Sequence, residues 1–135
     1  LETGAGSAEI VTPGGLVAVR TNLDPYLTKS DALVGSILGR VGELPPVHNS
    51  LPLKISLFES AVGTRDLIKV ENIKPGEVFR LNLGTAVTIG TVTSVKEEMI
   101  SIDLRRPVCA EIGSRVAISR RIADRWRLIG SGSLE

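Results

Sequence analysis

The sequence predicts an all-β protein: a small antiparallel β-barrel of the Greek-key type with a two-strand segment on its N-terminal side. Beyond residue 50, about six short stretches alternate apolar and polar residues with turn signals between them, and no long helical period occurs. Hydrophobic residues make up 42% of the chain but aromatic ones only 3%, so Val, Ile and Leu must build the core. A barrel is favoured over an open sheet because closure removes exposed strand edges.

The N-terminal segment contains two predicted strands. The apolar run at residues 16–20 follows the turn signal Pro13-Gly14-Gly15 and predicts the first strand. Residues 32–38 form a second apolar run, in which Gly35 indicates a bulge or a close backbone approach. The pair Pro45-Pro46 restricts the backbone to extended conformations, so we expect a linker there and place the domain boundary at residue 46.

Alternating stretches predict the strands of the barrel. The clearest is Leu53-Lys54-Ile55-Ser56-Leu57, with apolar side chains on one face and polar ones on the other. A phase slip near Gly90 predicts a β-bulge, and residues 67–70 are open to a loop or a short strand. The predicted strands lie at residues 53–57, 79–83, 87–95, 100–104, 116–118 and 126–128.

Both termini have the composition of flexible linkers. Gly and Ser residues bracketed by Leu-Glu stand at residues 1–7 and 131–135, and we interpret both segments as linkers or tags outside the fold. The predicted organisation is therefore a linker over 1–7, a two-strand segment with its proline linker over 8–46, a barrel over 47–130 and a terminal linker over 131–135.

Composition narrows the function classes. The 16 basic and 15 acidic residues leave a net charge of +1, so a basic binding site must be a local concentration of charge. The single cysteine, Cys109, excludes an internal disulfide, and with one histidine a structural zinc site is not expected. No run of 18 apolar residues and no signal peptide is present, so we expect a cytoplasmic protein with no membrane contact and no cofactor.

The most informative stretch is residues 107–130, where five arginines fall in the last two predicted strands. Alternate side chains of a strand share a face, so several of these arginines should share one exposed surface. Guanidinium groups pair with phosphates and with carboxylates, which suits contact with RNA or with another protein domain. The alternative is a solvated face whose arginines pair with acids such as Glu111, Asp103 and Asp124. The candidate contact residues are Arg115, Arg120, Arg121, Arg125 and Arg127.

Two further side chains have ordinary structural interpretations. Trp126 alternates with Leu128, a position typical of a core or rim residue rather than a stacking platform. His48 has no partner visible in the sequence, so we expect a surface histidine. With one histidine and nothing to orient it, no Ser-His-Asp set can be proposed, and we do not expect an enzyme.

Several motifs follow one another in the order seen in one protein family. They are Pro-Gly-Gly-Leu-Val at 13–17, Leu-Asp-Pro-Tyr-Leu-Thr-Lys at 23–29, Leu-Pro-Pro-Val at 44–47, Val-Gly-Thr at 62–64, Asn-Leu-Gly-Thr-Ala at 82–86 and the stretch 107–130, which ends in Arg-Trp-Arg-Leu-Ile-Gly. Over most of residues 13–130 the chain thereby resembles the gamma subunit of translation initiation factor 2. It resembles the archaeal members more than the eukaryotic ones, which carry a longer insertion after Val-Gly-Thr.

The resemblance implies a GTP-dependent carrier of methionyl initiator tRNA to the small ribosomal subunit, with a GTPase domain before two β-barrels and with alpha and beta subunits as partners. It places residues 8–46 at the end of the second domain and 47–130 in the third. The second domain of the family meets the alpha subunit and the acceptor end of the tRNA, so Tyr26 and Lys29 are candidates for a partner-contact loop. The phosphate-binding sequence G-x-x-x-x-G-K-[ST] is absent, so this chain should neither bind nor hydrolyse GTP.

Two hypotheses remain open for the chain itself. In the first it is the non-catalytic barrel part of such a gamma subunit, a platform that positions the tRNA, the alpha subunit and the GTPase domain. In the second it is an engineered structural scaffold or fusion module derived from that barrel, with no retained RNA binding. For the chain alone we expect either no partner or self-association through open strand edges in residues 8–40.

Overall fold

The computed structural model describes residues 1–63, 65 and 67–135, and the chain divides into two compact units, residues 1–33 and 34–135. The predicted boundary at residue 46 therefore falls inside the second unit. The reason lies at Gly35, where an added Cβ would stand 2.9 Å from the Cα of Ala86, so the segment before the prolines packs against the barrel. Thr64 of the Val-Gly-Thr motif lies outside the described residues.

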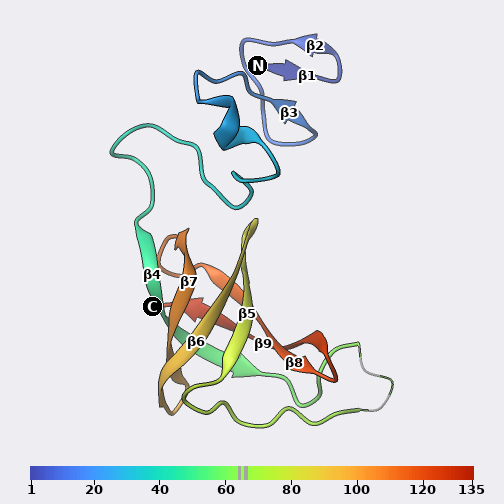
Figure 1. The fold of residues 1–135 in the computed structure, drawn as a ribbon, viewed down its shortest axis with the longest axis vertical. Coiled ribbons are helices and arrows are strands. Elements are labelled where there is room, and N and C mark those ends of the chain that lie inside the picture. Colours follow the sequence, from blue (N-terminus) through green and yellow to red (C-terminus); the bar gives the residue numbers. More distant parts are fainter. Residues whose placement is uncertain (64, 66) are drawn as a thin grey trace. The chain divides into compact units, whose positions relative to one another are not determined.

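Within the described residues of the second unit, six antiparallel strands close into a barrel in the order β4-β7-β6-β5-β8-β9. Figure 1 shows β4, in green, and β9, in red, whose pairing completes the ring. Consecutive hairpins join β5, β6 and β7, and β8 then returns beside β5, which is the Greek-key arrangement. The predicted fold class is thereby confirmed. The strands are β4 (Val47–Leu57), β5 (Val78–Leu83), β6 (Ala86–Lys96), β7 (Met99–Cys109), β8 (Arg115–Ile122) and β9 (Arg125–Leu134).

The alternation seen in the sequence becomes the core of the barrel. On β5, Phe79, Leu81 and Leu83 point inward and are buried, whereas the residues between them face outward. Every strand of the barrel contributes to this core, and its largest fully buried side chains are Leu51, Leu53, Phe79, Leu81, Ile100, Ile102, Ile118, Ile129 and Leu134. The core is therefore aliphatic with one phenylalanine, as the composition required.

The last strand runs on through the segment predicted to be a terminal linker. Ser131, Gly132, Ser133 and Leu134 pair with β4, and Leu134 is only 1% exposed, so the prediction of a linker is wrong for these residues. Glycine at two positions of this strand has a structural reason: an added Cβ would stand 2.5 Å from the carbonyl oxygen of Ser56 at Gly130, and 3.3 Å from the Cβ of Leu53 at Gly132. The two glycines allow β9 to approach β4 and close the barrel.

The first unit holds less regular structure than predicted. Its strands β1 (Glu2–Thr3), β2 (Gly6–Ser7) and β3 (Val17–Ala18) form a small sheet in the order β2-β1-β3, so residues 1–7 are not a plain linker. β3 falls within the first predicted strand. The second, at residues 32–38, is wrong: its first part is a turn, and Gly35 has a φ of +88°. Among the described residues, no helix has the length and apolar character needed to cross a bilayer.

The barrel has local irregularities in its strands and loops. The bulge predicted near Gly90 is present in the same strand, between Val92 and Ser94. Residues 67–70 form no named strand, although Lys69 makes an isolated bridge with Ser60. At the β8–β9 turn both Ala123 and Asp124 have positive φ, of 49° and 62°, which matches the right-handed twist of the two strands in a two-residue hairpin.

Candidate interaction surfaces

A β-bulge divides the five arginines of β8 and β9. Pairing between the two strands shifts at Ile118/Ser119, so Arg115 lies on one side of the bulge and the other four lie beyond it. Arg120 keeps the inward phase of Ile118, and Arg121 stands on the outer face opposite Trp126. The prediction of one shared, exposed arginine surface is therefore wrong for Arg120.

Arg120 is held by the segment that joins β4 to β5. Its Nη1 donates a hydrogen bond to the carbonyl of Glu71 at 2.9 Å, and its Nη2 donates to the Glu77 carboxylate at 3.0 Å and to the carbonyl of Asn72 at 3.5 Å. Its guanidinium carbon also lies 5.5 Å from the centroid of the Phe79 ring. With only 17% of its side chain exposed, Arg120 ties this segment to the barrel.

The other four arginines lie in three different places. Arg121 forms an ion pair of 4.0 Å with Asp124 at the β8–β9 turn, where Arg125 is also exposed. Arg127 is half-buried, and its guanidinium lies against Gly63. Arg115 is exposed at the opposite end of β8. Contact of these four residues with RNA or with another domain stays a prediction.

Tyr26 and Lys29 lie in the first unit, at a short 3-10 helix, η1 (Pro25–Thr28). Asp24 caps this helix, because its Oδ1 accepts a hydrogen bond of 2.9 Å from the backbone N–H of Tyr26. The Tyr26 side chain is 79% exposed and Lys29 is exposed as well. The geometry leaves both side chains accessible to a partner, and their role stays a prediction.

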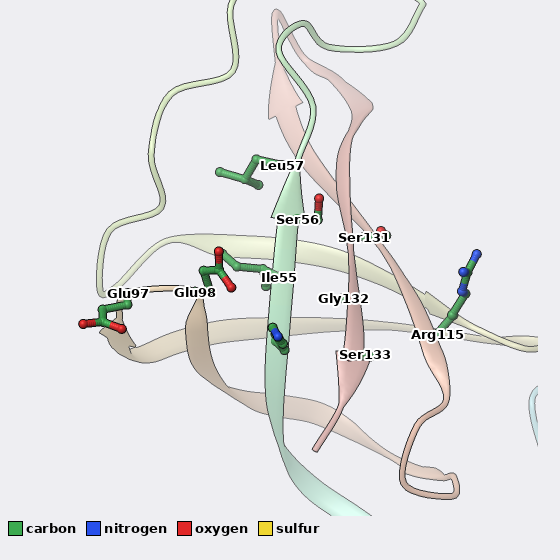
Figure 2. A pocket seen from close by; sticks show the side chains of 10 residues that line it. Ile55, Ser56, Leu57, Glu97, Glu98, Arg115, Ser131, Gly132 and Ser133 are labelled. Carbon is green, nitrogen blue, oxygen red and sulfur yellow. The ribbon is translucent and has the colours of Figure 1, made fainter.

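A shallow hollow of about 670 Å³ lies over β4 and β9, beside the turn that joins β6 to β7. Figure 2 shows Ile55, Ser56 and Leu57 along β4, with Glu97 and Glu98 on one side and Arg115 on the other. Two basic and two acidic side chains line the hollow, so their charges balance. The hollow is lined by Lys54, Ile55, Ser56, Leu57, Glu97, Glu98, Arg115, Ser131, Gly132 and Ser133.

A second hollow, on the outer face of the barrel, is basic. This groove of about 350 Å³ is lined by Arg80, Val87, Thr88, Ile89, Arg105, Arg106 and Trp126. Trp126 is half-buried on the outer face, so of the predicted core and rim positions it does not occupy the core. The groove could not be predicted from the sequence because its residues come from four strands. The alternation of β5 indicates only that Arg80, between the core residues Phe79 and Leu81, faces outward.

His48 and Cys109 both make hydrogen bonds to backbone. Nε2 of His48 lies 2.9 Å from the carbonyl oxygen of Ala110, a partner that the sequence did not reveal, and the side chain is half-buried. The thiol of Cys109 donates to the carbonyl of Pro45 at 3.1 Å. In the part of the chain that the structure describes, no group of three or more His, Cys, Asp or Glu side chains is placed to hold a metal ion.

Comparison with known proteins identifies the family. Residues 49–134 match the family described as "Initiation factor eIF2 gamma, C terminal", a range that covers almost all of the barrel. Translation initiation factor 2 subunit gamma of Methanocaldococcus jannaschii is 53% identical over 123 residues, which are 91% of this chain and 30% of that protein. The subunit of Pyrococcus abyssi is 53% identical over all 135 residues, or 33% of its length.

The chain thus spans about a third of the length of these relatives. Among solved structures, the bacterial selenocysteine-specific elongation factor EF-Sec is similar over 67% of this chain and 12% of its own, with 14% identity and a TM-score of 0.49. The match over the barrel and the identity over nearly the whole chain lead to one conclusion. The chain belongs to the family of translation initiation factor 2 gamma subunits and corresponds to their C-terminal part.

Proposed function

We propose that this chain is the non-catalytic β-barrel part of a gamma subunit whose parent delivers methionyl initiator tRNA to the small ribosomal subunit in a GTP-dependent manner. The observation that carries the proposal is the family match over residues 49–134, which coincides with strands β4 to β9. In this function the barrel is a rigid platform that fixes the relative positions of the tRNA, the alpha and beta subunits and the GTPase domain.

The surface of the barrel supports a role in binding rather than in catalysis. Side chains fill its interior, and the two hollows described above are lined mainly by aliphatic, serine, arginine, lysine and glutamate side chains. Such surfaces suit contacts with other macromolecules. The phosphate-binding loop sequence of GTPases does not occur in the chain, which agrees with a GTPase domain elsewhere in the parent.

The first unit fits the end of a preceding barrel. Its apolar side chains Ile10, Leu16 and Tyr26 are between 79% and 91% exposed. We take these exposed apolar side chains as part of a surface that another segment of the parent covers. In the parent, the remaining strands of the second domain would supply that surface. The scaffold hypothesis loses its main support, since residues 131–134, taken for a linker, are part of β9.

A chimera tests the proposed function. The matching C-terminal segment of the Methanocaldococcus jannaschii gamma subunit, 53% identical, is replaced by this chain, and binding of methionyl initiator tRNA is measured with GTP. We expect an affinity within about threefold of the unmodified subunit, because a platform is interchangeable when its fold is kept. A matched chimera with Leu53→Asp, which disrupts the core, serves as the control. Loss of tRNA binding by a correctly folded chimera would contradict the proposal.

A further inference from the structure

The basic groove has arginines on the two strands that flank β6, at the same level of the outer barrel face. Arg80 on β5 pairs with Ile89 on β6 and with Ser119 on β8. Arg105 on β7 follows Leu104, the partner of Gly90, and therefore stands beside Ile89. Neighbouring strands lie roughly 4.8 Å apart, so the backbones at Arg80 and Arg105 are about 10 Å apart on either side of Ile89.

Trp126 supplies the opposite wall of the groove. It pairs with Arg121 on the outer face and lies two residues along β9 from Leu128, the partner of Ser119. Because Ser119 is small, the indole reaches across β8 and lines the same groove as Arg80. The floor between the arginines and the indole is formed by strands, a rigid support for a binding site.

The charge of the groove is not neutralised by its own lining. Three of its seven lining residues are arginines and none is acidic. Within the described part of the chain, no ion pair joins Arg80 or Arg105 to a carboxylate. Thr88, only 4% exposed, donates to the carbonyl of Arg106 at 3.0 Å and accepts from its N–H at 3.3 Å, which fixes β7 at the groove.

The combination of arginines and an indole selects the class of ligand. Guanidinium groups bind phosphates bidentately, and a tryptophan face stacks on an unpaired base. Acidic peptides offer carboxylates but no flat ring for the indole, and duplex RNA keeps its base faces stacked inside the helix. The groove volume of about 350 Å³ lies in the range of small-ligand pockets and suits one nucleotide unit.

We propose that the groove of Arg80, Arg105 and Trp126 binds single-stranded RNA, with a phosphate between the two arginines and a base against the indole. This inference goes beyond the proposed function, because it concerns unpaired nucleotides and a surface that includes none of the candidate arginines. It can fail while the tRNA-binding chimera succeeds, and the reverse is equally true.

The single tryptophan of the chain gives a direct reporter of this site. Stacking of a base on Trp126 quenches its fluorescence, so hexa-adenylate RNA is titrated into the full chain at about 50 mM and about 200 mM salt. We expect saturable quenching that weakens at the higher salt concentration. Hexaglutamate and a short RNA duplex are the comparison probes. Absence of quenching by hexa-adenylate, or equal quenching by hexaglutamate, would overturn the proposal.

Matched variants test whether RNA binding depends on the groove or on the general positive charge of the surface. Arg105→Ala should weaken binding about tenfold. It should also reduce the slope of log K against log salt concentration by about 0.7, the value for one phosphate contact on a single strand. Lys96→Ala removes the same charge from an exposed position at the end of β6, outside both the groove and the candidate arginines, and should change the affinity less than about twofold. Trp126→Leu, followed by anisotropy of dye-labelled RNA, should weaken binding about tenfold, and Trp126→Phe should retain most of it. Equal effects of Arg105→Ala and Lys96→Ala on folded proteins would contradict a defined site.

Discussion

Arg120 shows how a charged residue in an arginine-rich strand can serve the fold. It stands on the same face of β8 as the core residue Ile118. Its guanidinium donates hydrogen bonds to the carbonyls of Glu71 and Asn72 and to the carboxylate of Glu77. Its Nε is buried with no partner among the described residues. A planar guanidinium donates from separate nitrogens in fixed directions and so reaches acceptors on both sides of the group, whereas a lysine donates from a single nitrogen.

Arg120→Ala should lower the free energy of unfolding by about 2 kcal/mol, because a charged hydrogen-bond network around Glu77 is lost and its acceptors are left partly buried. Arg120→Lys should recover only part of this loss. Arg121→Ala is the matched control: its ion pair with Asp124 is 4.0 Å long and exposed, so the change should stay within about 0.5 kcal/mol. Urea denaturation measures all three variants. Equal effects of Arg120→Ala and Arg121→Ala would contradict the structural role of Arg120.

At the scale of the strands, sequence reasoning succeeds where a strand has one apolar and one polar face. β5 was predicted over 79–83 and is Val78–Leu83, since Phe79, Leu81 and Leu83 alternate in the sequence. The end of β9 has no such signal, because residues 131–133 are Ser-Gly-Ser and Gly132 packs closely against Leu53 of β4.

The candidate site was harder to predict than the strands. The bulge at Ile118/Ser119 leaves Ile129 of β9 unpaired, so it shifts the faces of Arg125 and Arg127, and nothing in the sequence of β9 gives its place. The basic groove brings together residues up to 46 positions apart in the sequence, from Arg80 to Trp126, so it appears only when the barrel is closed. Composition and periodicity therefore predict the core better than the surface.

The end of β9 should be essential to the barrel. Leu134 is 1% exposed, its carbonyl accepts from the N–H of Gly113 at 2.7 Å, and its own N–H donates to the carbonyl of Ser114 at 2.9 Å. Leu134→Ala should lower the free energy of unfolding by about 3 kcal/mol, and deletion of residues 131–135 should cost more. Thermal unfolding followed by circular dichroism measures both. Glu135→Ala, at an exposed position, is the control.

Closure of the barrel at β4 and β9 also depends on Gly130. An added Cβ would meet the carbonyl oxygen of Ser56 at 2.5 Å and the Cα of Leu57 at 3.0 Å, and both are backbone atoms that cannot rotate away. Gly130→Ala should therefore lower the free energy of unfolding by about 2 kcal/mol or more. Gly4→Ala, where no atom lies within 4 Å, should change it by less than about 0.5 kcal/mol. Comparable losses in the two variants would show that close packing at Gly130 is not the cause.

At the scale of the whole molecule, the two units differ in what can stabilise them. All buried hydrophobic side chains of the described residues come from positions 51–134, and none comes from residues 1–33. Ordering a residue costs about 1.5 kcal/mol of conformational entropy, and burial of apolar surface is the main term that offsets this cost. Residues 1–33 bury no side chain, so the barrel should be the cooperative unit of the chain.

Deletion of residues 1–33 should therefore leave the melting temperature of the barrel within about 3 °C of that of the full chain, a shift that corresponds to less than about 1 kcal/mol. In the full chain, hydrogen exchange should show little protection for the amides of residues 1–33 and strong protection for the core strands, since local opening of a segment without buried contacts needs little free energy. A loss of more than about 5 °C on deletion would mean that the first unit shares the cooperative core. The barrel would then need the segment before it in order to fold, and a gamma subunit could not exchange its third domain as an independent platform.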